Sequence, residues 1–304
     1  MSVQPTDDPH RLATAEVVVG IDGSPSSDLA VRWAAEIASR RRRRLRIVHA
    51  LNLAATQAVL GMYDLMVPSV TETLREQARS RVATAHRLAR EIDTELDVAT
   101  EVRDGHPAKV LIDASAAAHL VVLGAGPGGP LVHLGSTLLA VTAHAEGAVV
   151  VVRDTGTEQQ TRHSGPVVVG VDGSPSSTAA IASAFAEASL RDAPLIALHA
   201  ANDISAVAFT GLTAVLPARE LELVAREVLA EQLAGWQEKY PDVTVEHKIY
   251  PADARKHLLE WSRTAQLIVV GSRGRGGFLG LLLGSTSGAL VQQAFCPVLV
   301  AHPE

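Results

Sequence analysis

The sequence contains an internal repeat, and this repeat limits the possible fold more than any other feature. Residues 17–27 read VVVGIDGSPSS and residues 167–177 read VVVGVDGSPSS, so the two segments differ only at Ile21 and Val171. Two further pairs keep nearly the same spacing: IVHA at 47–50 with ALHA at 197–200, and LGST at 134–137 with LGST at 283–286. Self-similarity of this kind indicates a duplicated domain. A chain of 304 residues has room for both copies.

The repeat also predicts the domain boundaries. Residues 154–165, DTGTEQQTRHSG, are polar and are interpreted as a linker. We assign residues 1–15 to a disordered tail, 16–153 to the first domain and 166–304 to the second domain. The chain begins with the polar segment MSVQPTDDPHR, which lacks the apolar stretch of a signal peptide, and we expect none.

Composition narrows the fold class and the compartment. Hydrophobic residues make up 47% of the chain but aromatic residues only 3%, which favours parallel sheets covered by helices over a β-sandwich. The single cysteine, Cys296, excludes an intramolecular disulfide and a cysteine-cluster metal site, and fits a reducing compartment. No uncharged apolar run approaches the roughly 18 residues of a membrane helix. We expect a cytoplasmic protein with no membrane insertion.

The charge of the chain argues against one class of partner. The formal net charge is −6 and the isoelectric point is about 6.1. A protein that binds DNA or RNA usually carries a basic surface. We therefore expect no nucleic acid partner.

The pattern of each copy alternates strand and helix. In the first copy, residues 16–22 form an apolar run that ends in turn residues, as expected of a buried parallel strand. Ser24 and Pro25 then supply an N-cap and a first-turn proline for a helix through 41. The remaining predicted elements are strand 45–51, helix 69–91, strand 97–105, helix 106–117, strand 119–125, helix 135–145 and strand 148–152. This alternation predicts right-handed βαβ units and an open, doubly wound α/β sheet in each copy.

Two special segments in each copy follow strands. Asp22 and Asp172 come directly after the first strand of their copies, and glycine-rich stretches at 124–137 and 271–286 come after the fourth. Ligands of open α/β sheets bind beyond the carboxyl ends of the strands, where the winding reverses. If strands one and four are neighbours, the aspartate and the glycines face one nucleotide site.

The glycine stretches have the chemistry that phosphate binding needs. Glycine lets the main chain approach an anion, and a helix beginning near Gly284, Ser285 and Thr286 directs free amides at it. The alternative is a flexible loop with a helix N-cap. The carboxylate of Asp172 repels phosphate, so we expect it to accept hydrogen bonds from ribose or base, or simply to cap its own turn.

Two common nucleotide motifs are set aside. Neither glycine stretch contains a lysine, so the chain has no Walker P-loop. Gly124, Gly126 and Gly129 match G-x-G-x-x-G by letter. However, they follow the fourth strand, and no suitable acidic residue lies about 20 residues further on, so a dinucleotide site is disfavoured.

With these motifs, the chain resembles the universal stress protein family in its tandem two-domain form, from Glu16 to His302. ATP-binding members of that family carry G-x2-G-x9-G-[S/T], and this spacing is matched by Gly271, Gly274, Gly284 and Ser285. The resemblance implies that Asp172 contacts the nucleoside, that Ala200 lies against it, and that Thr286 continues the phosphate cradle. It implies ATP as ligand, with Mg²⁺ bound through the triphosphate.

The resemblance also implies a fold and an assembly. The implied fold is Rossmann-like, of the adenine nucleotide α-hydrolase type, with five strands per domain in the order 3-2-1-4-5. Apolar edge strands such as AVVVV and CPVLVA are implied to pair two domains. That pairing is expected within the chain, as a pseudo-dimer, or between chains, as a homodimer.

The first copy departs from the family pattern. Pro127 replaces the second glycine, and the spacing from Gly124 to Gly135 is two residues shorter than that from Gly271 to Gly284. Gly126 and Gly128 are candidates to compensate. The remaining candidate binding residues of this copy still match the pattern: Asp22, Ala50, Gly124, Gly135, Ser136 and Thr137. ATP binding by the first copy stays open.

Other residues have simpler interpretations. We predict that the basic run at Arg40–Arg44, with Arg46, is solvated at a helix C-terminus; an acidic partner or polyphosphate is the alternative. His49 and His199 are predicted to be structural, with a place next to the ligand as the alternative. Cys296 is predicted to be a buried hydrophobic residue. Arg273 and Arg275 are either phosphate contacts or solvated loop residues.

Three functions fit these residues. The first is an ATP-dependent regulatory module of the stress response that acts on an unidentified protein partner and is not an enzyme. The second is a slow ATPase or related nucleotide hydrolase, which lacks an obvious general base or magnesium-binding acid pair here. The third is an interaction scaffold without nucleotide.

Overall fold

The computed structural model describes residues 15–53, 68–126, 135–153, 163–200, 218–275 and 283–303. Of the predicted tail, this includes only Ala15, which is buried and whose carbonyl accepts a hydrogen bond from Arg43 Nη1 at 2.7 Å. Of the predicted linker, it includes residues 163–165. The rest of both segments lies outside the described residues.

The first copy forms the predicted alternation of strands and helices. Its elements are β1 (Glu16–Ile21), α2 (Pro25–Arg40), β2 (Leu45–Leu51), α5 (Pro68–Ile92), β3 (Val98–Asp104), α6 (Pro107–Ser115), β4 (Ala118–Ala125), α7 (Ser136–His144) and β5 (Ala148–Arg153). Their bounds agree with the predicted ones to within a few residues.

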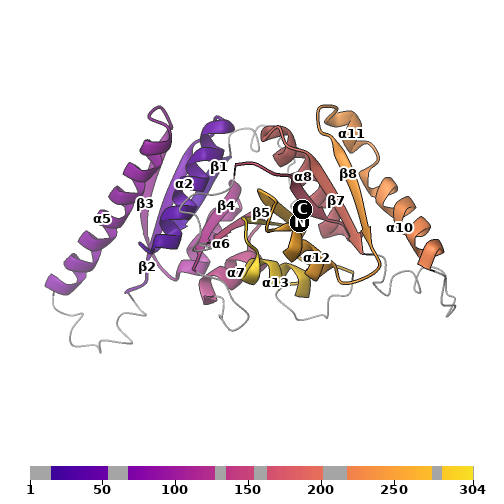
Figure 1. The fold of residues 1–304 in the computed structure, drawn as a ribbon. Coiled ribbons are helices and arrows are strands. Elements are labelled where there is room, and N and C mark those ends of the chain that lie inside the picture. Colours follow the sequence, from indigo (N-terminus) through magenta and orange to yellow (C-terminus); the bar gives the residue numbers. More distant parts are fainter. Residues whose placement is uncertain are drawn as a thin grey trace, which may run out of the picture.

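The second copy repeats this order and adds the short helix α11. Its elements are β6 (Val167–Gly170), α8 (Pro175–Leu190), β7 (Leu195–Ala200), α10 (Ala218–Leu233), α11 (Trp236–Lys239), β8 (Val245–Tyr250), α12 (Ala254–Trp261), β9 (Leu267–Gly271), α13 (Ser285–Gln293) and β10 (Val298–Ala301). Figure 1 shows the two copies side by side, with α5 and α10 at the outer ends.

The strands of both copies join in one sheet with the order β3-β2-β1-β4-β5-β10-β9-β6-β7-β8. Within each copy the order is the expected 3-2-1-4-5, and neighbouring strands are parallel. The junction is antiparallel: β5 and β10 pair with Val151 opposite Val298 and Val149 opposite Val300. The edge strands of the two copies therefore cover each other within one chain, which removes two exposed sheet edges.

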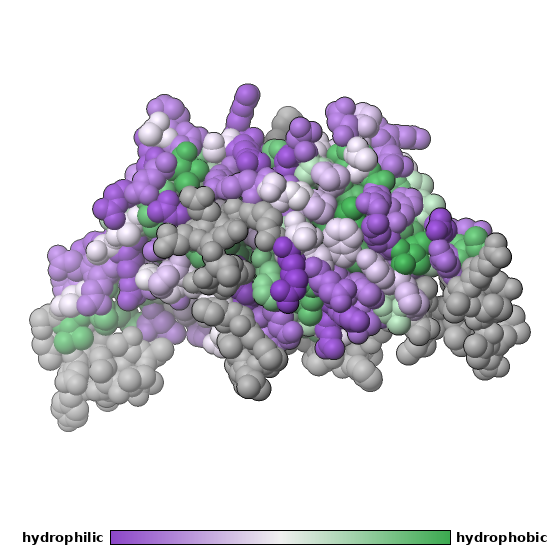
Figure 2. Space-filling model, viewed as in Figure 1, coloured by the Kyte–Doolittle hydropathy of each residue, from purple (hydrophilic) through white to green (hydrophobic). Residues whose placement is uncertain are grey.

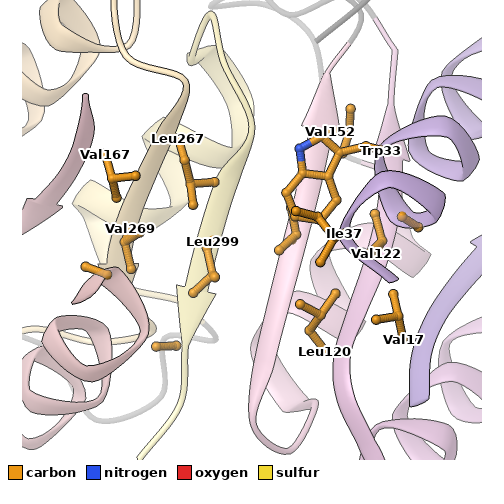
Figure 3. Packing of buried hydrophobic residues seen from close by; sticks show 14 of the residues in the cluster. Val17, Trp33, Ile37, Leu120, Val122, Val152, Val167, Leu267, Val269 and Leu299 are labelled. Atoms are coloured by element: carbon orange, nitrogen blue, oxygen red, sulfur yellow. The ribbon is translucent and has the colours of Figure 1, made fainter. Parts of the chain in front are cut away.

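Each face of the sheet is covered by helices from both copies. One core cluster contains residues of α2, α5, α8 and α10, and the cluster on the opposite face contains residues of α6, α7, α12 and α13. Both clusters run through the junction; Figure 3 shows Val152 and Leu299 on the facing edge strands within one of them. The two copies consequently share a continuous hydrophobic core on each face.

The helix starts follow from local sequence. Ser24 Oγ accepts a hydrogen bond from Ser27 N at 3.2 Å, and Ser174 Oγ accepts one from Ser177 N at 3.2 Å. Each serine precedes a proline at the first helical position, where the missing N–H has no intrahelical partner to lose. The predicted cap is confirmed in both copies, and it directs α2 and α8 away from the strand ends.

The described residues on one face of the molecule are mainly polar. In Figure 2, hydrophilic residues cover most of the described part of the face shown, with hydrophobic residues in smaller areas between them. Among the described residues, the exposed large hydrophobic side chains are Val102, Leu223, Val224 and Phe295. Scattered exposed residues of this kind are ordinary for a folded protein.

Candidate functional site

The aspartate turns lie at the carboxyl ends of β1 and β6. Asp22 Oδ1 accepts a hydrogen bond from Ser24 N at 2.9 Å, and Asp172 Oδ1 accepts one from Ser174 N at 2.9 Å. Burial alone raises the pKa of Asp22, but its hydrogen bonds with Ser24 and Ser27 outweigh burial and lower it. In both copies the carboxylate caps its own turn.

In the second copy the aspartate also contacts the glycine stretch. Asp172 Oδ2 accepts a hydrogen bond from Arg275 N at 3.1 Å, and Ser174 Oγ donates to the carbonyl of Arg273 at 3.3 Å. A Cβ built on Gly274 would lie 2.4 Å from Asp172 Oδ2, well inside contact distance. The two segments therefore lie together at one strand edge, as the order of strands one and four predicts.

Gly271 lies where the helix α8 approaches the end of β9. A Cβ built on Gly271 would lie 2.6 Å from the Cβ of Ser176 and 2.7 Å from its carbonyl carbon. Ser287 Oγ donates a hydrogen bond to the Gly271 carbonyl at 2.6 Å, so the glycine is also joined to α13. Only glycine fits this position without displacing backbone.

The start of α13 closes the glycine stretch. Gly284 is the N-cap of this helix, and its amide donates to the Ser272 carbonyl at 2.9 Å. Ser285 and Thr286 then lie in the first helical turn, whose amides have no partner within the helix. These amides and the positive end of the helix dipole make an anion-binding end. Residues 276–282, between Arg275 and Leu283, lie outside the described residues.

Ala50 and Ala200 occupy matched places near the ends of β2 and β7. Ala200 is the last residue of its strand, is buried, and pairs in register with Tyr250 of β8. Ala50 pairs with Arg103 of β3 and is half-buried. Both lie beside the strand that carries the aspartate turn.

The neighbouring histidines are structural, as predicted. Nδ1 of His49 lies 2.8 Å from the Ile21 carbonyl, and Nδ1 of His199 lies 2.7 Å from the Val171 carbonyl. A ring nitrogen facing a carbonyl carries the proton, so each histidine donates to the residue before the aspartate. Cys296 is buried, again as predicted.

The first copy keeps part of this arrangement. A Cβ built on Gly124 would lie 2.1 Å from the Ser26 carbonyl oxygen, the same close approach as at Gly271. By contrast, Cβ atoms built on Gly126 and Gly135 would meet nothing within 4 Å. Gly135 is the N-cap of α7, and Ser136 and Thr137 begin that helix. Pro127, Gly128 and Gly129 lie outside the described residues.

Each copy places a guanidinium over the glycine after its aspartate, but from different elements. Arg275 Nη2 donates to the Gly173 carbonyl at 3.3 Å. In the first copy Arg81 of α5 reaches Gly23, and a Cβ built on Gly23 would lie 3.1 Å from Arg81 Nε. Arg81 was not predicted as a site residue. It is exposed, and its place three residues after Ala78 and four before Ala85, at the border of the buried stripe of α5, was the available signal.

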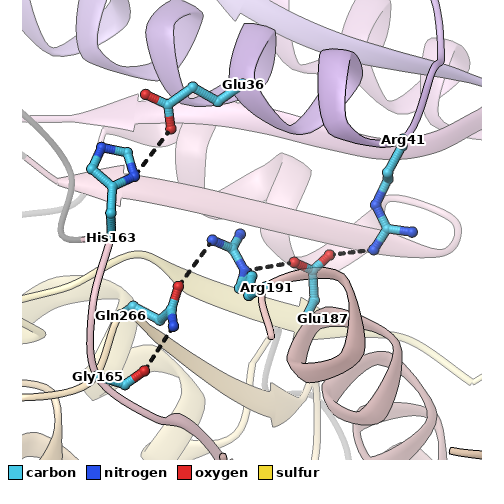
Figure 4. A network of polar contacts seen from close by, with 7 residues as sticks. All are labelled: Glu36, Arg41, His163, Gly165, Glu187, Arg191 and Gln266. Carbon is cyan, nitrogen blue, oxygen red and sulfur yellow. Dashed lines mark hydrogen bonds and ion pairs between the residues drawn. The ribbon is translucent and has the colours of Figure 1, made fainter. Parts of the chain in front are cut away.

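The predicted solvation of the basic run is wrong for Arg41. Arg41 Nη2 lies 2.6 Å from Glu187 Oε1, and Arg191 Nε lies 3.0 Å from Glu187 Oε2. The side chains of Arg41, Glu187 and Arg191 are 15%, 2% and 5% exposed, so this triplet is buried between α2 of one copy and α8 of the other. Figure 4 shows the triplet beside Gln266 and Gly165. Docking of the copies covers a helix end that is solvated in an isolated domain.

Burial alone raises the pKa of Glu187, but Arg191 and Arg41 outweigh it, and the pKa is lowered. The Arg191 guanidinium also lies over Trp33, 5.5 Å from the ring centroid. A charged carboxylate is therefore part of the interface between the copies.

Within the described residues, no group of three or more histidine, cysteine, aspartate or glutamate residues is arranged to hold a metal ion. No helix in the described ranges is long and apolar enough to cross a membrane.

Comparison with known proteins gives consistent matches. The model of the universal stress protein family matches twice, at residues 15–153 and 164–302. A universal stress protein of Mycolicibacterium smegmatis is 42% identical over 293 residues, covering 94% of this chain and 97% of the relative. One of Mycobacterium tuberculosis is 40% identical over 292 residues, covering 94% and 96%.

A solved structure agrees in fold. The crystal structure of a universal stress protein from Archaeoglobus fulgidus superimposes with a TM-score of 0.66 at 18% identity. The match covers 95% of this chain and 98% of that chain. At this level of identity the likeness concerns the fold alone.

Proposed function

Because the chain belongs to the universal stress protein family, we propose that it is an ATP-binding regulatory protein of the stress response and that its second copy holds the nucleotide. The observation that carries the proposal is the contact between the aspartate turn and the glycine stretch of that copy. Arg275 N donates to Asp172 Oδ2 at 3.1 Å, so one ligand can reach both segments.

The residues present fit a nucleoside triphosphate. Gly271 and Gly274 keep the main chain free of side chains where a Cβ would collide, and the amides of Ser285 and Thr286 begin α13 without intrahelical partners. Bound ATP would supply the negative charge that these amides and Arg273 attract, and Mg²⁺ would enter with it, held through the triphosphate. Asp172 would face the nucleoside, away from that charge.

The geometry supports binding more than turnover. Both oxygens of Asp172 already accept main-chain hydrogen bonds, from Ser174 and Arg275. A carboxylate held in this way is a positioning group and a poor general base. We therefore propose that occupancy of the site orders the glycine stretch and changes a surface recognised by a protein partner, without catalysis.

The test is calorimetry of the full chain with MgATP. We expect wild type to bind and Gly274→Ala to bind at its second copy at least about tenfold more weakly. The added Cβ displaces the Asp172 carboxylate and removes a charged hydrogen bond, which is worth about 1.5–3 kcal/mol. Gly288→Ala is the matched control, since its Cβ would meet nothing within 4 Å. Unchanged affinity in Gly274→Ala contradicts the assignment.

Two outcomes favour the alternative functions. Several turnovers of MgATP per minute, abolished by Gly284→Ala, would replace the binding module with a slow ATPase. If wild type binds no MgATP, and acid extraction of the purified protein releases no adenine nucleotide, the protein is an interaction scaffold. The number of MgATP molecules that Gly274→Ala still binds with unchanged affinity shows whether the first copy, with its different glycine stretch, also binds the nucleotide.

A further inference from the structure

The helices that begin at the two glycine stretches end in carbonyls that need partners. The last four carbonyls of a helix have no acceptor role within it. In α7 and α13 the first of them is paired locally: Ala145 N donates to Val141 O and Ala294 N donates to Leu290 O, both at 2.9 Å. The next carbonyls along are those of Thr142 and Val291.

Nearby amides point elsewhere. Glu146 N donates to Ser115 Oγ at 2.8 Å, and Phe295 N donates to Ser262 Oγ at 3.1 Å. Glu146 N and Phe295 N would be the helical donors to the carbonyls four residues earlier, those of Thr142 and Val291. They donate instead to serines at the ends of α6 and α12. The carbonyls of the two helix ends must be capped by other groups.

The caps come from the opposite copy. Arg153 Nη2, at the end of β5 in the first copy, donates to the carbonyl of Val291 in α13. His302 Nε2, just after β10 in the second copy, lies 3.0 Å from the carbonyl of Thr142 in α7. Each residue reaches across the antiparallel junction to the helix of the other domain.

The two contacts are equivalent in the repeat. Arg153 and His302 follow the matched edge-strand segments AVVVV and CPVLVA. Val291 and Thr142 lie the same number of residues after the N-cap glycines Gly284 and Gly135. The guanidinium of Arg153 at a helix C-terminus is favoured by the helix dipole, whereas burial lowers the pKa of His302 and favours its neutral ring. Equivalent residues of the two copies thus make the same contact in opposite directions. We infer that the two contacts belong to the interface and are not chance surface pairs.

Arg153 makes a second contact that lies in its own copy. Its Nη1 donates to the Gly126 carbonyl at 2.6 Å, at the beginning of the first glycine stretch. We call α7 and α13, which begin at the glycine stretches, the cradle helices. The guanidinium of Arg153 thus joins the glycine stretch of the first copy to α13, the cradle helix of the second. The other ring nitrogen of His302 lies 2.9 Å from the Gly147 carbonyl, before β5. A neutral ring donates to one of the two carbonyls, and only the protonated ring donates to both.

We propose that Arg153 and His302 are positioning residues that orient the cradle helix of the opposite copy, so that nucleotide occupancy in one copy changes affinity in the other. The inference rests on the proposed nucleotide binding. Each cradle helix has nine residues, about 13 Å at 1.5 Å per residue. A short rigid helix held at its C-terminal end has its N-terminal amides held as well, and these are the amides that would face the phosphates of a bound nucleotide.

Hydrogen exchange of the free full-length protein tests the capping without any nucleotide. Arg153→Met should speed exchange about tenfold in residues 285–293 and leave residues 136–144 unchanged, since one charged hydrogen bond is lost in the other copy. His302→Leu should instead speed exchange in residues 136–144 and leave residues 285–293 unchanged. The exchanged variants Arg153→His and His302→Arg, each carrying the residue of the other copy, should restore protection. Faster exchange confined to the copy that carries the substitution overturns the proposal.

Calorimetry with MgATP then tests the coupling. Arg153→Met should weaken binding at the second copy by about fivefold, at the low end of ordinary coupling between sites, and Arg153→His should recover most of it. If wild type binds MgATP and Arg153→Met binds equally well, the coupling is wrong. If wild type binds none, the proposed function fails and so does the coupling, while the exchange experiment still decides whether the helices are capped across the junction.

Discussion

Replacing His119 with glutamine should make the stability of the protein less dependent on pH. His119 lies in β4 at the interface between the copies. Its burial, and then the charges of Arg41 and Arg43, lower its pKa from 6.5 to about 4, with Glu187 acting in the opposite direction. The folded protein therefore holds this imidazole neutral where a solvated histidine is already protonated.

The size of the effect follows from the two pKa values. In the unfolded chain His119 takes up a proton near pH 6.5, whereas in the folded chain it does so only near 4. Lowering the pH favours the state that binds more protons, which is the unfolded state. Between about pH 7 and about pH 5 one such histidine removes about 2 kcal/mol from the free energy of unfolding.

Urea unfolding of wild type and His119→Gln at both pH values measures this quantity. Glutamine is the matched substitution because Gln266 occupies the corresponding place before β9, where it accepts a hydrogen bond from Arg191 at 3.4 Å. The other titrating groups are shared by both proteins, so the difference between their pH dependences isolates His119. Wild type should lose about 2 kcal/mol more than the variant on acidification.

Two results would refute this reasoning. Equal losses of stability in the two proteins would show that His119 contributes no pH dependence. An NMR titration of the ring that gives a midpoint near 6.5 would show that the interface does not exclude its charged form. Either result would also argue against an effect of the arginines Arg41 and Arg43 on this ring.

Other predictions concern the junction and the glycine positions. Glu187→Ala should lower the free energy of unfolding by about 3–5 kcal/mol, because it leaves Arg41 and Arg191 buried without a counter-charge; a loss below about 1 kcal/mol in urea unfolding would contradict this. Gly124→Ala should lower the thermal midpoint, because the new Cβ would lie 2.1 Å from main chain at the start of α2, whereas Gly126→Ala, with nothing within 4 Å, should not. Equal midpoints for these two variants would argue against the close approach.

Much of the fold was predictable from the sequence because its signals are local. Ser24 and Pro25 define the start of α2 through one hydrogen bond and one missing donor, and the apolar run of β1 needs no knowledge of its neighbours. The repeat supplied the second domain, and the glycine and aspartate positions indicated which strand edge carries the site. Resemblance to a family was still needed for the strand order and the nucleotide.

The family resemblance implied that the edge strands pair, but only the tertiary structure decided which side chains that junction buries. Arg41 belongs to a run of arginines that reads as a solvated helix end, yet it is buried against Glu187 because β5 and β10 pair and bring α2 beside α8. Arg153 and His302 show the same limit: their partners are 138 and 160 residues away in sequence. Local pattern records which face of an element is apolar, but a buried ion pair or a helix cap across a junction depends on the geometry of chain segments that meet only after folding.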